Sequence, residues 1–182
     1  MRDPAAVMDA VRKVWASVFS DRAWEARERF GIDHATALPA VLIQEGVAAE
    51  AAGVLLAGDP EDPADRDAVR VAAKRGLGLR VVQGGPLLEQ VRVRPATAET
   101  IVLSRSEDRI ALAFDERGGL RERPVAAGAP VLDKATVLEL ARLGLEIRRV
   151  FGGVPQDVEW VVEGGRVWIV QARPYPVQGG GR

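Results

Sequence analysis

The stretch that decides the fold runs over Pro155–Pro176, with the sequence PQDVEWVVEGGRVWIVQARPYP. Two runs rich in β-branched and aromatic residues, Val158–Glu163 and Val167–Ala172, flank the pair Gly164–Gly165. This pattern predicts a β-hairpin. Three polar side chains interrupt the apolar runs, and their position in the hairpin decides what they can do: Glu159, Gln171 and Arg173.

The length of the turn determines which side chains share a face of the hairpin. A two-residue turn places Glu159 opposite Val170, and Gln171 then points to the other face. A three-residue loop, Gly164–Arg166, places Glu159 opposite Gln171. Only the three-residue loop gives one uniformly apolar face, made of Val158, Trp160, Val162, Trp168, Val170 and Ala172. We therefore expect that loop, with the three polar residues at one end of the other face, beside Val161, Val167 and Ile169.

Side chains of this kind, placed together, match a complex of a metal ion and a nucleotide. A carboxylate and an amide oxygen, here Glu159 and Gln171, are hard ligands of the type that Mg²⁺ accepts. The planar guanidinium of Arg173 matches phosphate oxygens. The hairpin alone leaves a second interpretation open, in which Glu159 and Arg173 form an ordinary salt bridge at a strand end.

The composition is that of a soluble globular protein of 182 residues, which fits one domain or one lobe of a larger domain. A net charge of −1 gives no electrostatic argument for binding nucleic acid or an anionic membrane. No cysteine is present, and the single histidine, His34, rules out a multi-histidine metal centre. Its expected place is the surface or a helix cap. The sequence shows neither a signal-peptide core nor a membrane-spanning stretch, so we expect a cytoplasmic protein.

The remaining pattern predicts an α+β fold. We expect one helix from about Pro4 to Phe30 and another from about Lys134 to Val150, capped by Asp133 and Gly152. The second helix should pack through Val137, Leu140, Ala141, Gly144, Ile147 and Val150. Between the helices, short strands are expected in the stretches LPAVLIQEGV, EAAGVLLAGDP, RVAAKR, LLEQVRVRP, ETIVLSR and RIALAF. The order of helix, antiparallel strands, helix and hairpin is typical of α+β domains.

One glycine-rich stretch superficially resembles a phosphate-binding loop. Gly76-Leu77-Gly78 lacks the Lys-Ser/Thr of a P-loop and the spacing of a dinucleotide fingerprint, so it predicts a tight turn.

Six blocks of the chain, in order, resemble a known family. They are VWASVFSDRAWEARERFGIDH, LPAVLIQEGV, AAGVLLAGDP, GLGLRVVQGG, VLELARLGLEIRRVFGGVPQDVEW and VWIVQARP. Together they are similar to the C-terminal portion of the ATP-binding domain of phosphoenolpyruvate synthase and pyruvate phosphate dikinase. PQDVEW with QARP at its spacing is the most specific element, and the similarity spans nearly the whole chain.

The resemblance implies an ATP-grasp-type lobe, with a mainly antiparallel sheet and flanking helices, over residues 1–176, followed by a flexible tail, 177–182. It implies ATP and Mg²⁺ as cofactors, with Glu159 and Gln171 as metal ligands and Arg173 at the β- and γ-phosphates. Gln44, Glu45 and Val47 match positions that line the adenine pocket, although Gln44 without the resemblance would be a polar residue at a strand edge. A preceding ATP-grasp lobe and a phosphohistidine domain, in the same or another chain, are implied partners.

The function that the resemblance implies is the MgATP-binding portion of a phosphoenolpyruvate synthase-like phosphotransferase, a pyruvate, water dikinase. For the chain by itself we expect weak nucleotide binding, no turnover and self-association through a face left open. The chain departs from the family at Gly76-Leu77-Gly78-Leu79, where the family has Gly-Leu-Gly-Glu. Two alternatives therefore stay open: a non-catalytic ATP-binding or regulatory module, and a diverged interaction domain that binds no nucleotide.

Overall fold

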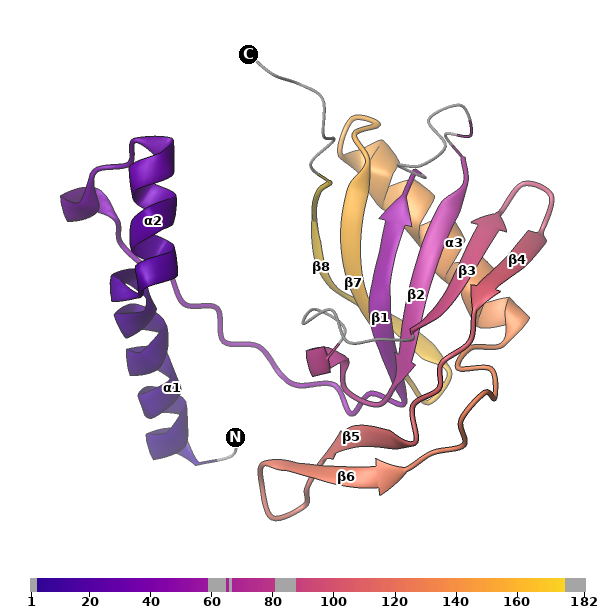
Figure 1. The fold of residues 1–182 in the computed structure, drawn as a ribbon, viewed down its shortest axis with the longest axis horizontal. Coiled ribbons are helices and arrows are strands. Elements are labelled where there is room, and N and C mark those ends of the chain that lie inside the picture. The colour runs from indigo at the N-terminus through magenta and orange to yellow at the C-terminus, as the bar shows by residue number, and fades with distance from the viewer. Residues whose placement is uncertain (1–2, 59–64, 66, 81–87, 176–182) are drawn as a thin grey trace. The chain divides into compact units, whose positions relative to one another are not determined.

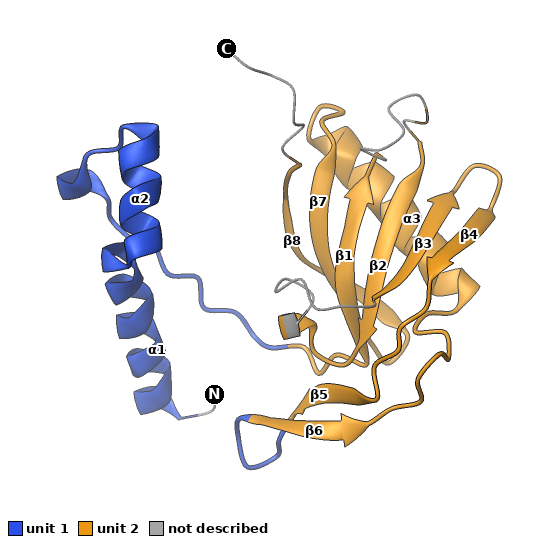
Figure 2. Cartoon of the chain, viewed as in Figure 1, with its two compact units in different colours: residues 1–46, 115–119 blue, residues 47–114, 120–182 orange. Residues whose placement is uncertain are grey.

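Two compact units make up the chain. The computed structural model describes residues 3–58, 65, 67–80 and 88–175. Unit 1 comprises residues 1–46 and 115–119, and unit 2 comprises residues 47–114 and 120–182 (Figure 2). The predicted tail, 177–182, lies outside the described residues.

Unit 1 is helical, but the predicted single helix over Pro4–Phe30 is wrong. The structure has α1 (Pro4–Ala16), a short 3₁₀-helix η1 (Ser17–Phe19) and α2 (Asp21–Phe30). The break occurs at Ser20, whose backbone is extended (φ −70°, ψ 151°) and whose hydroxyl accepts a hydrogen bond from the Ala23 N–H. Serine favours such an N-cap over a helix interior because its hydroxyl bonds nearby backbone groups.

The segment that follows was predicted to contain a strand, and this prediction is also wrong. After the 3₁₀-helix η2 (His34–Thr36), the stretch LPAVLIQEGV forms no strand, and Leu42 and Ile43 are exposed. Its β-branched composition favours a strand, but a strand needs a neighbour to pair with.

Unit 2 is built on a six-stranded antiparallel sheet with the order β4-β3-β2-β1-β7-β8 (Figure 1). A separate hairpin, β5-β6, includes one strand that the sequence did not predict, β6. The expected α+β class with a mainly antiparallel sheet is therefore confirmed. The strands are β1 (Ala51–Ala57), β2 (Val69–Arg75), β3 (Glu89–Arg94), β4 (Glu99–Ser104), β5 (Ile110–Phe114), β6 (Leu120–Pro124), β7 (Gln156–Glu163) and β8 (Arg166–Pro174).

A single helix, α3 (Lys134–Val150), lies along one face of the six-stranded sheet (Figure 1). We call this the closed face, and the other the open face. Asp133 caps α3 as predicted, whereas the C-cap is Phe151 and the left-handed Gly152 follows it. The predicted apolar stripe is buried at four positions, but its last member, Val150, is 73% exposed. The closed-face core gathers alternate residues of the strands, including Leu55, Val71, Val93, Val158 and Trp160.

The β7-β8 hairpin corrects the predicted turn. Glu163 pairs with Arg166, so the turn has only two residues, Gly164 and Gly165. A β-bulge then shifts the register: Trp160 pairs with Ile169, while Glu159 pairs with Gln171, which leaves Val170 as the extra residue. The predicted pairing of Glu159 with Gln171 is confirmed for a different reason than the one expected. The two-residue turn places Val167 and Ile169 on the closed face and Trp168 opposite Val161 on the open face, and the bulge returns Gln171 and Arg173 to the open face.

Candidate functional site

The open face of β7 and β8 carries the predicted polar residues. Glu159 and Gln171 are directly opposite each other, and Glu159 is half-buried while Gln171 is exposed. Both offer oxygen atoms, and Mg²⁺ is held in proteins by one or two carboxylates together with oxygens of the substrate phosphates. The pair therefore fits a magnesium ion that a phosphate-bearing ligand helps to bind. Within the described part of the chain, no cluster of three or more His, Cys, Asp or Glu side chains could hold a metal by itself.

Arg173 lies on the same face of β8, two residues beyond Gln171. Its side chain is held by Asp157, a residue that the sequence analysis did not single out. Its Nε and Nη2 atoms donate to Oδ2 of Asp157 at 2.9 and 2.8 Å. This hydrogen bonding, reinforced by the charge of the carboxylate, raises the pKa of Arg173 above its usual range. The strand period contained the signal, because Asp157 and Glu159 are two residues apart and so share a face.

At the other end of the open face the surface becomes apolar. Val161, two residues beyond Glu159, packs against a small cluster of Ala49, Ala52 and Leu77. Trp168 lies opposite Val161, and the Arg166 guanidinium stacks on its ring at 4.1 Å. The open face thus changes from apolar to charged over a few residues along β7.

Of the three predicted adenine-pocket residues, only Val47 belongs to unit 2. The backbone next to it is tied to the hairpin turn by two carboxylates. The Ala48 N–H donates to Glu163 at 3.1 Å, and the Gly164 N–H donates to Glu50 at 3.2 Å. Val47 therefore lies near the apolar end of the open face.

The other two, Gln44 and Glu45, are exposed residues of unit 1. They lie outside any helix or strand.

The histidine is part of a local cluster within unit 1. Arg27 Nε donates to Nδ1 of His34 at 2.8 Å, and Nε2 of the ring lies 2.7 Å from Glu28. Because the Arg27 guanidinium can only donate, Nδ1 of His34 accepts in this hydrogen bond and Nε2 faces the Glu28 carboxylate. The ring also stacks on Trp24, with 3.7 Å between the ring centroids, so His34 is a half-buried part of this cluster, whereas the sequence predicted a surface or helix-capping residue.

The Gly76-Leu77-Gly78 stretch follows directly after β2: Gly76 forms an isolated bridge with Leu112, and a 3₁₀-helix, η3 (Gly78–Arg80), begins at Gly78. Gly76 has φ +76°, and a Cβ at this position would lie 2.3 Å from the Leu112 carbonyl oxygen. This glycine is required by backbone geometry, because a residue with a side chain is strained at such a φ and here also clashes. Leu79, which stands where the family has glutamate, is 54% exposed.

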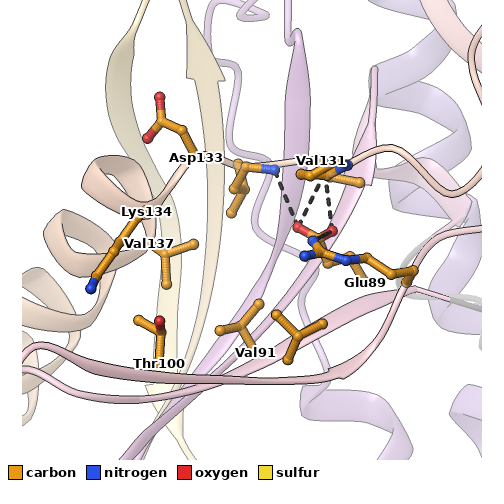
Figure 3. A pocket seen from close by; sticks show the side chains of 11 residues that line it. Glu89, Val91, Thr100, Val131, Asp133, Lys134 and Val137 are labelled. Atoms are coloured by element: carbon orange, nitrogen blue, oxygen red, sulfur yellow. Dashed lines mark hydrogen bonds and ion pairs between the residues drawn. The ribbon is translucent and has the colours of Figure 1, made fainter.

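A cavity of about 430 Å³ lies on the closed-face side, between β3, β4 and the start of α3 (Figure 3). Its wall contains Glu89, a fully buried carboxylate that accepts hydrogen bonds from the N–H groups of Val131 and Leu132 at 3.1 and 3.2 Å. Arg105 completes the arrangement with a salt bridge. Since these bonds satisfy the carboxylate and pin the segment before α3, Glu89 has a structural role. None of the predicted site residues lines this cavity.

In the part of the chain that the structure describes, no helix is long and apolar enough to span a membrane.

Comparisons with known proteins agree with the resemblance seen in the sequence. The family model described as "Pyruvate phosphate dikinase, AMP/ATP-binding domain" matches residues 1–181. A rifampicin phosphotransferase of Streptomyces sviceus is 38% identical over 176 residues, which are 94% of this chain and 20% of that protein. A probable phosphoenolpyruvate synthase of Methanothermobacter thermautotrophicus is 32% identical over 175 residues, 95% of this chain and 25% of that protein. The chain therefore spans about a fifth to a quarter of the length of these relatives, and it belongs to the family of pyruvate phosphate dikinase AMP/ATP-binding domains.

Proposed function

We propose that this chain binds MgATP on the open face of its sheet and supplies metal and phosphate ligands for phosphoryl transfer from ATP. The observation that carries the proposal is the cross-strand pair Glu159 and Gln171, with Arg173 beside it on the same face. In a chain of this family, that set of groups has one coherent use. We infer an ATP-grasp-type lobe over residues 1–176, as part of a phosphoenolpyruvate synthase-like phosphotransferase.

In this proposal Glu159 and Gln171 hold Mg²⁺, which neutralises charge on the phosphate oxygens. Arg173 binds the β- and γ-phosphates, which must compete with Asp157 for its guanidinium. Phosphoryl transfer asks a protein mainly for positioning and for stabilising oxygen charge. An arginine held in place beforehand by a carboxylate serves that purpose, because little side-chain freedom remains to be lost on binding.

The nucleotide base belongs at the other end of the open face. Val47, which lies near the hairpin turn, is next to the apolar end, and Gln44 and Glu45 precede it in the chain. We propose that these three residues line the adenine pocket. The ring of a nucleotide suits the apolar cluster at Val161, beside which Lys74 is paired with Asp108, and its phosphates suit Arg173 at the other end.

The final acceptor of the phosphoryl group is determined outside this segment. Two of its relatives, a rifampicin phosphotransferase and a probable phosphoenolpyruvate synthase, differ by name in the acceptor, although both are similar to it over more than nine-tenths of its length. What they share over this segment is therefore the use of ATP. A second ATP-grasp lobe and a phosphohistidine domain are the partners we propose, and the chain alone should bind nucleotide weakly without turnover.

The direct test is isothermal titration of the chain with a non-hydrolysable ATP analogue, with and without Mg²⁺. We expect magnesium-dependent binding that Glu159→Ala removes and Glu139→Ala leaves unchanged. Glu139 is a matched control because it is an exposed glutamate on α3, on the opposite side of the sheet. Absence of binding in every condition, or equal binding by both variants, would contradict the proposal.

The exposed Leu79, in place of the family's glutamate, favours one second candidate, a module that binds ATP without transferring phosphate. The full-length protein separates the two. If the chain is catalytic, Glu159→Ala, Gln171→Ala and Arg173→Ala each abolish the conversion of ATP while the fold is retained. A full-length protein that binds ATP but never consumes it supports the second candidate.

A further inference from the structure

The cavity between β3, β4 and the start of α3 has an apolar wall that solvent can reach. Val91 of β3 and Val137 of α3 are both 4% exposed, whereas Val102 of β4, which lines the same cavity, is 44% exposed. The volume of about 430 Å³ lies in the range of cavities that bind small organic molecules. The closed-face side therefore offers a place for a ligand that is separate from the open face.

The two carboxylates that line this cavity are already compensated. Glu89 is fully buried and is bound by two backbone N–H groups and by Arg105. Asp133 caps α3, and its side chain points away from Val91 and Val137 (Figure 3). Neither carboxylate therefore needs a cation from a ligand.

The two cations that line the cavity still have N–H groups to offer. Among the described residues, Arg105 donates to Glu89 through Nη1 alone, and its side chain is 41% exposed. Lys134 is exposed, and its ammonium group makes no ion pair or hydrogen bond within the described part of the chain. A lysine and an arginine beside an apolar wall, with the nearby carboxylates compensated, suit an anion that also has an apolar part.

We propose that this cavity binds a small organic anion, a carboxylate that carries an apolar ring or chain. The apolar part packs against Val91, Val102 and Val137, and the carboxylate pairs with Lys134 and Arg105. An ion pair at an exposed site contributes little by itself, so the apolar contact supplies most of the affinity and the charge supplies the selectivity. The inference does not rest on the proposed function, because this cavity lies on the other side of the sheet.

The test titrates the isotope-labelled chain with naphthylacetate, with its neutral counterpart naphthylethanol, and with acetate, and follows the backbone amides by NMR. The N–H groups of Val131 and Leu132 are the reporters, because both residues line the cavity and donate to Glu89. The alcohol separates the contribution of the charge from that of the ring, and acetate does the reverse.

Two pairs of variants provide matched controls. Val102→Asp places a negative charge in the cavity wall, and Ile101→Asp places the same charge on the neighbouring residue of β4, which is 43% exposed and does not line the cavity. Lys134→Met removes the ammonium group and retains an apolar stem. Lys13→Met is its control, because Lys13 is an exposed lysine of unit 1.

We expect naphthylacetate to shift the two reporter amides saturably, naphthylethanol to bind more weakly and acetate to leave them unchanged. Val102→Asp should abolish binding of naphthylacetate. Lys134→Met should weaken naphthylacetate about threefold and leave naphthylethanol unchanged. Ile101→Asp and Lys13→Met should match the wild type.

Three results would overturn the inference. Reporter amides that do not respond to naphthylacetate exclude the site, and equal affinity for the acid and the alcohol excludes selection of an anion. Shifts of the same amides on dilution without ligand assign the cavity to a contact with a second copy of the chain.

Thermal unfolding without ligand checks the fold of each variant. Should Val102→Asp lose stability, Val102→Phe takes its place, because phenylalanine favours a strand and fills the cavity with an apolar ring. Ile101→Phe is then the control, and retained binding in Val102→Phe contradicts the proposed site.

Discussion

The two faces of the sheet use the same chemical group in opposite ways. On the closed face, Glu89 is fully buried and bound by backbone N–H groups and Arg105. On the open face, Asp157 binds Arg173, whose side chain is 63% exposed. A buried carboxylate that is fully hydrogen-bonded fixes structure, because every partner depends on it. An arginine at the surface can exchange its carboxylate partner for a phosphate at little cost, which is what a binding face requires.

The largest expected effect is on the closed face. Glu89→Ala leaves the N–H groups of Val131 and Leu132 without their acceptor in a buried place. We expect a loss of about 3 kcal/mol or more in the free energy of unfolding, measured by urea denaturation. Gln90→Ala is the control, since Gln90 is the next residue of β3 and faces the other way. A loss below 1 kcal/mol in Glu89→Ala would remove the contrast between the faces.

An intermediate effect is expected at Asp133, which caps α3 by accepting from the Thr136 N–H at 2.7 Å. Asp133→Ala should cost about 1 kcal/mol at neutral pH. That hydrogen bond lowers the pKa of Asp133 in the folded chain. A lowered folded pKa gives stability that is present above the unfolded value of about 3.9 and is lost as pH falls toward the folded value.

Denaturant unfolding of the wild type, Asp133→Asn and Asp133→Ala at pH 7 and near pH 3 checks this. Asparagine retains an uncharged cap, so the difference between wild type and Asp133→Asn isolates the charge and should shrink at low pH. A difference that grows on acidification would contradict the direction of the shift.

The smallest expected effect on stability is on the open face. Asp157→Asn removes the charge that pairs with Arg173; the carboxylate is 16% exposed, but its partner is 63% exposed, and a pair that is screened by water on one side contributes little. We expect a change within about 1 kcal/mol in the free energy of unfolding. The affinity for the ATP analogue, by contrast, should fall measurably, because Arg173 loses the carboxylate that holds it in place. A large loss of stability without any change in binding would assign Asp157 to the fold.

The periodicity of apolar residues and the capping residues predicted the helices and strands correctly where these patterns were strong. The helix over Lys134–Val150, its Asp133 cap and the strands from β1 to β5 follow from period and capping residues, and the structure confirms them. The same patterns failed where the secondary structure depends on neighbouring segments or on a single capping residue. LPAVLIQEGV has the composition of a strand but no pairing partner, and Ser20 ends a helix that periodicity alone would continue.

The site shows the same division. The pairing of Glu159 with Gln171 was predicted from a turn that is one residue too long, and the bulge at Val170 restores the register. Asp157 could have been found by extending the strand period, whereas Glu89 could not, because its backbone donors lie 42 and 43 residues away in the chain and meet it only in the fold.

By itself, then, the sequence determined the family, the α+β class and the group of residues at the PQDVEW and QARP blocks, because these depend on residue identity and on periods of a few residues. Only the tertiary structure decided the register of β7 against β8 and the pairing of Asp157 with Arg173. Those features depend on which strands become neighbours, and strand pairing is set by burial of the whole closed face against α3.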